Sequence, residues 1–339
     1  MPKSTFEVFD MYGPCSPSAA ARTSPMKMPS PHDILRLDQL RVKALQARFK
    51  SNSTTNKNDS RFQDTKDVAH LLVEFSNSNH AITIGLGTPP QIQTLIFDIG
   101  SDITWSNGLN SDSLQIISCD SPSCHFLPQH TCETFKNLEN TCFYNIGYGY
   151  GPNSKGALIR GILTIQQTGD MFQFLFGCAT EVSSQMLMNL NANGVLGLGK
   201  DPISFVSQTE DIYNGIFSYC FPSSPSSTGF LKLGPRDYPD NMRFTPLIAS
   251  LSYPSFYFIN IISISVGHVQ LSINLLDLRF PGTVIDSGTV VSRLPLNVYI
   301  TMRNEFHRQM TNYGYQTAQS PHHFFDTCYN DIHEFFIPP

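Results

Sequence analysis

One short pattern occurs twice in the chain and constrains its fold more than any other feature. In each copy an apolar run is followed by Asp, a small or β-branched residue, Gly and a hydroxyl residue. An apolar run favours a buried strand, and the glycine behind it indicates a sharp turn that displays the carboxylate. A single turn of this kind is usually no more than a turn. Two copies indicate an internal duplication in which each half contributes one Asp: Asp98-Ile99-Gly100-Ser101 and Asp286-Ser287-Gly288-Thr289.

Two such carboxylates have a specific chemical use when they lie close together. Like charges split their titration, so one carboxyl stays protonated in mildly acidic solution. The ionised partner can take a proton from a water molecule, and the protonated partner can donate to a carbonyl oxygen. Ser101 and Thr289, three residues after each Asp, are placed to donate hydrogen bonds to the carboxylates. The pair predicts hydrolysis of amides without a metal or a cofactor.

Composition and charge narrow the class of protein. The 339 residues are 40% hydrophobic and 14% charged, with 25 Phe, 13 Tyr and 23 Pro. This composition favours strands and turns over helices. The net charge is −5, but residues 1–70 are net basic and the remainder is strongly acidic. A basic leader on an acidic body suggests an electrostatic clamp that weakens as carboxylates become protonated, with a solvated basic helix as the alternative. The acidic body argues against nucleic acid as a partner.

Cysteine usage indicates the compartment. Four of the eight cysteines fall close together: Cys119, Cys124, Cys132 and Cys142. Their spacing lacks the pair-and-pair pattern of a zinc site, although His125 and His130 lie among them, so we expect no metal. Clustered cysteines favour disulfides and an oxidising compartment. The N-terminus shows no hydrophobic signal region, which conflicts with that compartment unless further sequence precedes it. No apolar run of 18 residues occurs, so we expect no membrane span.

The expected elements follow from composition and periodicity. Residues 1–30 are expected to be irregular, 31–49 to form a basic helix, and 50–67 to be a polar linker. Strands are expected up to Asp98, then Cys-rich loops and a long hairpin over 143–165. Further strands are expected at 172–178, 194–199, 217–221, 229–233, 257–266 and 269–273, and helices at 202–208 and 296–310.

With these features in place, the chain resembles the plant atypical, nepenthesin-like aspartic proteases of the pepsin-like family. It is most similar to the subgroup described as chloroplast-nucleoid DNA-binding protease-like. The motifs that carry the resemblance span nearly the whole chain: both Asp turns, Tyr148-Gly149, Val195-Leu196-Gly197, Gly85-Leu86-Gly87-Thr88-Pro89, Phe217-Ser218-Tyr219-Cys220 and Phe325-Asp326-Thr327-Cys328-Tyr329.

The resemblance implies an all-β, bilobal pepsin-like acid protease fold with a deep cleft between the lobes. Residues 1–78 would form a prosegment-like leader, 79–246 the N-terminal catalytic lobe and 247–339 a partial C-terminal lobe. The second lobe would be incomplete, because relatives continue with more strands beyond the position of Pro339.

The implied function is that of an aspartic endopeptidase acting at acidic pH on polypeptide substrates, made as a zymogen restrained by its own prosegment and working as a monomer. The resemblance gives catalytic roles to Asp98 and Asp286 and a flap over the cleft to Tyr148 and Gly149. The other motif residues would support the catalytic pair: Gly100, Ser101, Ser287, Gly288 and Thr289. The implied location is the secretory pathway, in the cell wall or vacuole, with the plastid as the alternative.

One departure from the family pattern motivates a second hypothesis. Ile99 stands where relatives carry Thr or Ser, so the hydroxyl that ties this loop to the other lobe is missing. The tip of the flap also differs, with Gly149-Tyr150-Gly151-Pro152 where relatives have an acidic residue and then Gly-Ser. The alternative is a non-catalytic relative that binds peptides or proteins through the same cleft.

Overall fold

Strands dominate the computed structural model, which confirms the predicted all-β class. The structure describes residues 4–10, 30–51, 68–71, 80–109, 113–147, 153–182, 192–222, 224, 226–235, 241–279, 282–319 and 325–329. The helices among them are α1 (Pro31–Ser51), the 3-10 helix η2 (Pro122–Phe126), α3 (Phe205–Gln208), α4 (Glu210–Tyr213), α5 (Leu276–Arg279) and α6 (Leu296–Asn312).

The strands fall into one large group and several short pairs. The first group is β1 (Ser4–Asp10), β3 (His80–Leu86), β4 (Gln91–Asp98), β5 (Trp105–Asn107), β6 (Gln115–Ile116), β7 (His130–Phe135), β8 (Leu138–Gly147), β9 (Asn153–Ile165), β10 (Asp170–Val182), β11 (Gly194–Gly197), β12 (Phe217–Cys220) and β13 (Thr228–Leu233). The others are β2 (Val68–Leu71), β14 (Tyr257–Ile259), β15 (Ser265–Val266), β16 (Val269–Gln270), β17 (Thr283–Ile285), β18 (Ser292–Pro295), β19 (Thr317–Ala318) and β20 (Cys328–Tyr329).

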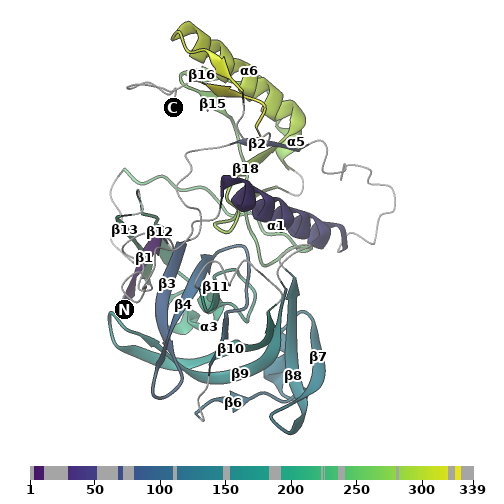
Figure 1. Ribbon diagram of the computed structural model, residues 1–339, viewed down its shortest axis with the longest axis vertical. Coiled ribbons are helices and arrows are strands. Elements are labelled where there is room, and N and C mark those ends of the chain that lie inside the picture. The colour runs from purple at the N-terminus through teal and green to yellow at the C-terminus, as the bar shows by residue number, and fades with distance from the viewer. Residues whose placement is uncertain are drawn as a thin grey trace.

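The large group forms one sheet of twelve strands in the order β12-β13-β1-β3-β4-β11-β5-β10-β9-β8-β7. Strand β6 pairs with β9, and β3 also pairs with β9, so the sheet curls back on itself like a barrel (Figure 1). Strands β8 and β9 form the expected hairpin. Strands β3, β4 and β11 bury side chains on both of their faces over most of their length, so the centre of the sheet lies inside the core.

Strand β4 ends on Asp98, and β11 runs parallel to it. The pairing places Gly197 opposite Asp98. A Cβ atom on Gly197 would lie 2.2 Å from the backbone oxygen of Asp102, so only glycine fits behind the first Asp turn. The apolar-apolar-Gly segment therefore supports that turn through backbone contact.

The first residues of the chain belong to this sheet, so the prediction that residues 1–30 are irregular is wrong for Ser4–Asp10. Strand β1 pairs antiparallel with β13 and with β3. Phe6 and Val8 have no exposed surface and belong to the main core cluster, with Phe97 and Ile99. The alternation of apolar and polar residues in β1 is short, and its partners lie far away in the sequence. Local composition therefore hid the strand.

The strands after β13 lie outside the large sheet and form short, separate pairs, one of them with β2. These pairs are β14–β17, β15–β16, β18–β2 and β19–β20, with α6 packed beside them. The predicted strand over 257–266 is wrong in extent: β14 ends at Ile259, and the next strand begins at Ser265. Its ladder partner β17 is only three residues long, so the pairing stops there. Ile262, in the interrupted part, is 80% exposed.

Helix α1 lies between the large sheet and the part of the molecule that carries α6 (Figure 1). It includes the predicted basic helix over 31–49. Ile34 and Leu35 are buried. Two further leader segments flank it in sequence, since β1 precedes α1 and β2 follows it. The segments that precede and follow α1 thus pair with different parts of the chain, β1 with the large sheet and β2 with β18.

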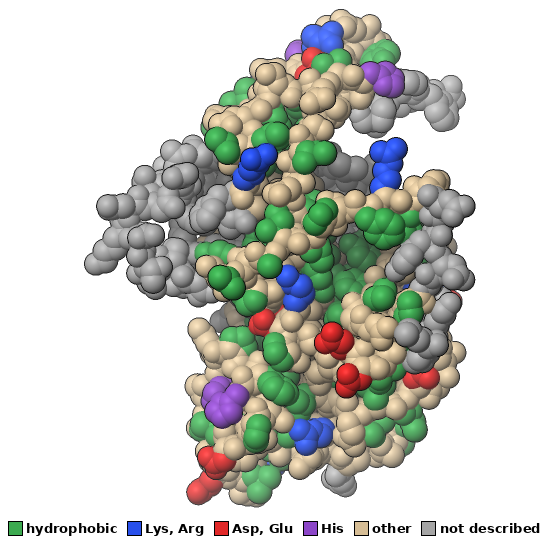
Figure 2. All heavy atoms as spheres, turned by 180° about the vertical axis from the view of Figure 1, so that it is seen from behind, with side chains coloured by type: hydrophobic (Ala, Val, Ile, Leu, Met, Phe, Trp, Pro, Cys, Tyr) green, Lys and Arg blue, Asp and Glu red, His purple; other side chains and the backbone are tan. Residues whose placement is uncertain are grey.

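On the face shown in Figure 2, a few basic and acidic side chains lie among hydrophobic and neutral ones. None of the described helices is both long enough and apolar enough to cross a membrane.

Candidate active site

Asp98 stands at the end of β4 in a buried turn. Its side chain is 2% exposed. The Ser101 hydroxyl donates to Oδ2 at 2.6 Å, and the backbone N–H of Gly100 donates to Oδ1 at 3.0 Å. The carboxylate therefore has one donor on each oxygen from its own turn, as expected for a group that is held in place.

Asp286 follows β17 in a turn with the same hydrogen bonds. The Thr289 hydroxyl donates to Oδ2 at 2.5 Å, and the N–H of Gly288 donates to Oδ1 at 3.0 Å. Its side chain is 5% exposed. Each Asp thus receives an N–H from the second residue after it and an O–H from the third. The two turns are structural duplicates, as their sequences suggest.

The two turns are tied together on one side. The Ser287 hydroxyl accepts a hydrogen bond from the N–H of Ile99 at 3.0 Å. The same hydroxyl donates to the carbonyl oxygen of Phe97 at 3.4 Å. The equivalent side chain in the first turn is Ile99, which has no polar atom and is buried in the main core cluster. Ser287 therefore links the second turn to the first without a reciprocal bond.

Arg41 of α1 lies between the two carboxylates. Its Nη2 atom is 2.7 Å from Oδ1 of Asp98 and 2.8 Å from Oδ1 of Asp286, and its Nε donates to Oδ2 of Asp286 at 3.1 Å. A single nitrogen in contact with both shows that the two Asp side chains converge on one point. The Arg41 side chain is 15% exposed, so these ion pairs are largely shielded from water.

This arrangement shifts the titration of the site. Burial by itself would raise the pKa of Asp286, but the charge of Arg41 and the hydrogen bonds from Arg41, Thr289 and Gly288 outweigh it and hold the pKa below its ordinary value. Burial would likewise lower the pKa of Arg41, and the two carboxylates more than reverse that effect. Helix α1 therefore stabilises the ionised form of Asp286.

Sequence reasoning counted Arg41 among the residues that make the predicted helix basic but did not single it out. The available signal was a basic helix upstream of an acidic body that holds two displayed Asp residues. The predicted helix over 31–49 holds four Lys and Arg residues, Arg36, Arg41, Lys43 and Arg48, and only the tertiary structure distinguishes among them.

Comparisons with known proteins agree with this geometry. A family model described as Xylanase inhibitor N-terminal matches residues 80–235, and one described as Xylanase inhibitor C-terminal matches residues 256–334. An aspartyl protease family protein of Arabidopsis thaliana is 35% identical over 97% of this chain and 71% of its own length. Aspartyl protease AED1 of the same plant is 34% identical over 97% of this chain and 70% of its own length. The chain belongs to the plant atypical aspartyl protease family.

A more distant relative and two solved structures of other proteins are also similar to this family member. Aspartic proteinase nepenthesin-2 of Nepenthes gracilis is 30% identical over 69% of this chain and 56% of its own length. Basic 7S globulin from soybean has a TM-score of 0.60 at 23% identity and covers 79% of this chain and 76% of its own. Conglutin gamma from lupine seeds has a TM-score of 0.57 at 22% identity, covering 77% and 74%. At these identities the two structures establish the fold.

The predicted flap residues Tyr148 and Gly149 lie outside the described residues. Tyr148 and Gly149 fall between β8 and β9, whose described parts end at Gly147 and resume at Asn153. The hairpin position is therefore present, and the flap role of these two residues stays a prediction.

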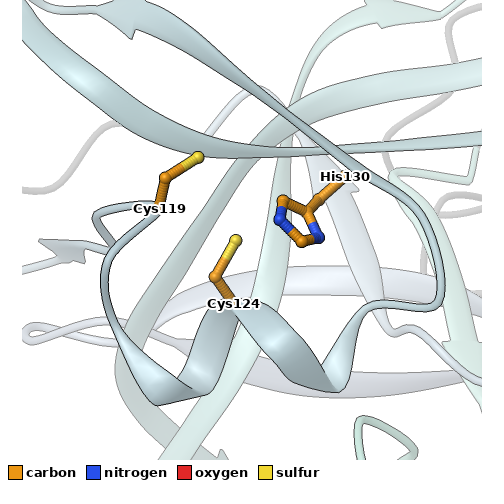
Figure 3. Close-up of side chains that lie close together, drawn as sticks. All are labelled: Cys119, Cys124 and His130. Atoms are coloured by element: carbon orange, nitrogen blue, oxygen red, sulfur yellow. The ribbon is translucent and has the colours of Figure 1, made fainter.

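The clustered cysteines of this family member form disulfides, as predicted from their spacing. Cys119 is bonded to Cys132, and Cys124 to Cys142. The expected loops hold more regular structure than predicted, because η2 and β7 lie among the cysteines. Figure 3 shows that Cys119, Cys124 and His130 lie close enough for one metal ion to reach all three. Both sulfurs are already bonded to other cysteines, so they do not offer thiolates to a metal in this state.

Proposed function

We propose that this chain is an aspartic endopeptidase that hydrolyses peptide bonds at acidic pH, with Asp98 and Asp286 activating a water molecule. The observation that carries the proposal is the convergence of two carboxylates with duplicate hydrogen bonds on the single guanidinium of Arg41. Once the cation leaves, two buried acids this close hold a single proton between them at mildly acidic pH.

The chemistry follows from that shared proton. The ionised carboxylate accepts a proton from the attacking water, while the protonated one donates to the oxygen of the scissile carbonyl. Gly100, Ser101, Gly288 and Thr289 keep the carboxylates oriented through the step, and Ser287 holds the two turns in register. Tyr148 and Gly149 would cover the substrate as a flap.

We also propose that residues 1–78 act as a leader that inhibits the site until acid releases it. Arg41 occupies the place where the water and the scissile bond must bind. Because the pKa of Asp286 is lowered in the leader-bound form, that form gains stability above the ordinary Asp pKa. It loses this stability as the pH falls through the lowered value. The lobe boundaries at 79–246 and 247–339 are part of the same proposal.

The remaining expectations belong to this proposal as well. The substrates are polypeptides, and the enzyme is a monomer without nucleic acid or membrane partners. Two disulfides fit an oxidising compartment, so we propose the secretory pathway with the cell wall or vacuole as destination, and the plastid as the alternative.

A second candidate function is a non-catalytic member that binds peptides or proteins through the site. Two observations favour it. The matching family models are described by the name xylanase inhibitor, and Ile99 removes one of two expected ties between the Asp turns. Losing such a hydrogen bond costs about 1 kcal/mol, which loosens the placement of Asp98 without abolishing it.

Cleavage of an unfolded protein by the purified full chain at pH 3 to 5 tests the proposal. We expect cleavage after acid incubation, inhibition by pepstatin, and loss of activity in Asp98→Asn and Asp286→Asn. Thr301→Val, at a half-buried position on α6, serves as the matched control that keeps activity. Absence of cleavage from a folded chain, with peptide binding retained, would establish the binding function instead.

A further inference from the structure

Helix α1 presents a second charged residue beside Arg41. Asp38 lies three positions earlier on the same helix, so the two side chains project from one face. Arg41 reaches the two Asp turns, and Asp38 reaches the segment that follows the second turn. The helix therefore contacts the region of Asp286 with an anion as well as with a cation.

The carboxylate of Asp38 is held by two groups of that segment. Oδ1 accepts a hydrogen bond from the N–H of Val290 at 2.5 Å, and Oδ2 lies 2.5 Å from Nη2 of Arg293. The Asp38 side chain has no exposed surface, and that of Arg293 is 10% exposed. Val290 and Arg293 come four and seven residues after Asp286, so this carboxylate site adjoins the proposed catalytic pair.

The guanidinium of Arg293 is oriented by its own segment and directed at the leader. Its Nη1 donates to the carbonyl oxygen of Val291 at 3.2 Å, and its Nη2 lies 3.4 Å from Oε1 of Gln39 on α1. Its Nε is buried without a hydrogen-bond partner. This donor is free to complete a bidentate contact with a carboxylate that is better aligned than that of Asp38.

Release of the leader would leave Arg293 without an anion and the N–H of Val290 without a hydrogen-bond acceptor. A buried guanidinium without its anion is strongly disfavoured, and the N–H of Val290 loses its acceptor. The backbone edge of β18, which includes Arg293, also loses its partner β2. An extended polypeptide entering the site meets an oriented cation, a free N–H and an open strand edge within seven residues of Asp286.

We propose that Arg293, together with the N–H of Val290, is a specificity-determining subsite for an acidic side chain of the substrate, which Asp38 occupies while the leader is bound. The inference rests on the proposed function, because it takes the leader helix to occupy the substrate's place. Substrates cleaved by this enzyme carry Asp or Glu at one fixed position relative to the scissile bond, on the side bound by Arg293.

Matched peptides test this subsite. Pairs of octapeptides are prepared that carry either Glu or Gln at one position, with that position moved along the peptide from pair to pair. Their cleavage by the acid-incubated full chain is measured at pH 5, where the Glu side chain is mostly ionised. We expect one position at which kcat/KM is at least tenfold higher for Glu. Arg293→Gln brings that ratio close to one, and Arg293→Glu reverses the preference in favour of the Gln peptide. Arg308→Gln, which alters an exposed pair on α6, leaves the ratio unchanged.

A binding measurement makes the test independent of catalysis. The same peptide pairs are titrated by fluorescence anisotropy against a full chain carrying Asp38→Ala and Arg41→Ala, whose leader has lost both of its charged contacts with the site. We expect a Kd at least tenfold lower for the Glu peptide, and no difference after Arg293→Gln is added. A Glu preference in binding without any cleavage would reject the proposed protease while supporting the subsite. Equal affinity for both peptides, binding of neither, or a cleavage ratio that Arg293→Gln leaves intact would overturn the subsite.

Discussion

Ile99 and Ser287 hold equivalent positions in the two Asp turns but do different things. The Ser287 hydroxyl bridges to the backbone of the first turn, while Ile99 packs its side chain into the main core cluster. At this position the chain has exchanged a hydrogen bond for buried apolar surface. Asp98 therefore relies on its own turn and on Ser287 for its placement.

Two substitutions at position 99 separate these contributions. Ile99→Val removes one buried methylene group. Ile99→Thr gives a side chain with the shape of valine, in which a hydroxyl replaces one methyl group. We expect Ile99→Val to lower the free energy of unfolding by about 1 kcal/mol. We expect Ile99→Thr to be about 1 kcal/mol more stable than Ile99→Val, because its hydroxyl can make the reciprocal bond to the second turn.

Urea unfolding of the three chains measures the difference, and peptide cleavage by the same chains tests the placement of Asp98. A lower stability of Ile99→Thr than of Ile99→Val would show that the introduced hydroxyl is buried without an acceptor. The first turn would then be unable to make the hydrogen bond that Ser287 makes from the second turn.

At the scale of elements, strand β1 makes the leader part of the folded core. Phe6 and Val8 have no exposed surface, and Phe6 meets Phe205 edge to face with ring centroids 6.3 Å apart. A leader that was only a removable inhibitor would not need to supply a strand between β13 and β3. The strand gives the leader a structural contribution in addition to its contact with the carboxylates.

Truncation of a buried side chain in β1 measures that contribution. We expect Phe6→Ala to lower the free energy of unfolding by about 3–5 kcal/mol, because it removes a large side chain from a closed core. Thr5→Ala, at a partly exposed position of the same strand, is the control and should change stability far less. A loss below about 1 kcal/mol for Phe6→Ala would show that β1 is not seated in the sheet.

The pairing of β1 with β3 also places a half-buried titratable ring at the start of β3. His80 lies opposite Asp10 in the register and stacks on Phe221 with ring centroids 4.1 Å apart. Burial lowers the pKa of His80 to about 4. The unfolded chain, with an ordinary His pKa near 6.5, therefore binds more protons between pH 6.5 and 4. His80 thus lowers stability as the pH falls through this range, with no further loss below pH 4.

His80→Phe tests this pH dependence while keeping the stacked ring. Between pH 7 and pH 4.5 we expect the wild-type chain to lose about 2–3 kcal/mol more stability than the variant, measured by urea unfolding. His125→Phe, at an exposed position, should retain the wild-type pH dependence. Parallel curves for wild type and His80→Phe would mean that His80 is protonated in the folded chain.

At the scale of the whole molecule, the leader joins both halves of the chain through charge. Arg41 bridges Asp98 from the first half and Asp286 from the second, and Asp38 pairs with Arg293. These pairs are shielded from water, so removing one partner leaves an uncompensated charge and costs about 3–5 kcal/mol. The attachment of α1 to the two Asp turns therefore depends on a small number of side chains.

Arg41→Ala tests this dependence. We expect the backbone amides of α1 to lose hydrogen-exchange protection by at least a hundredfold at pH 6, since two buried carboxylates then face each other without a cation. In the wild-type chain the same loss should appear only as the pH falls below the ordinary Asp pKa and through the lowered pKa of Asp286. Arg36→Ala, at an exposed position of α1, is the control. Unchanged protection in Arg41→Ala would show that α1 is held by other contacts.

Much of the architecture could be read from local pattern. The strand that delivers Asp98, the hairpin over β8 and β9, and helices α1 and α6 appear close to their predicted places. Their signals are periodic apolar residues bounded by glycine, proline and polar residues, and such signals act within a few residues. The duplicate turns were also predictable, because Ser101 and Thr289 lie at the same short distance from each Asp.

The elements that sequence reasoning missed depend on partners far away in the chain. Strand β1 exists because β13 and β3 leave a place for it, and the predicted strand at 257–266 stops at Ile259 because β17 is short. The disulfide partners in the Cys-rich segment were likewise open until β7 and β8 brought Cys132 beside Cys119 and Cys142 beside Cys124.

The sequence by itself determined that the chain is a β protein with two displayed carboxylates and a basic leader, because strand periodicity, turn chemistry and charge are local properties. Only the tertiary structure decided which cation meets those carboxylates. It selected Arg41 among the basic residues of α1 and paired Asp38 with Arg293. The reason is physical: the pairing of buried charges depends on distances of a few ångströms between segments that lie far apart in the sequence, and desolvation makes any other arrangement costly.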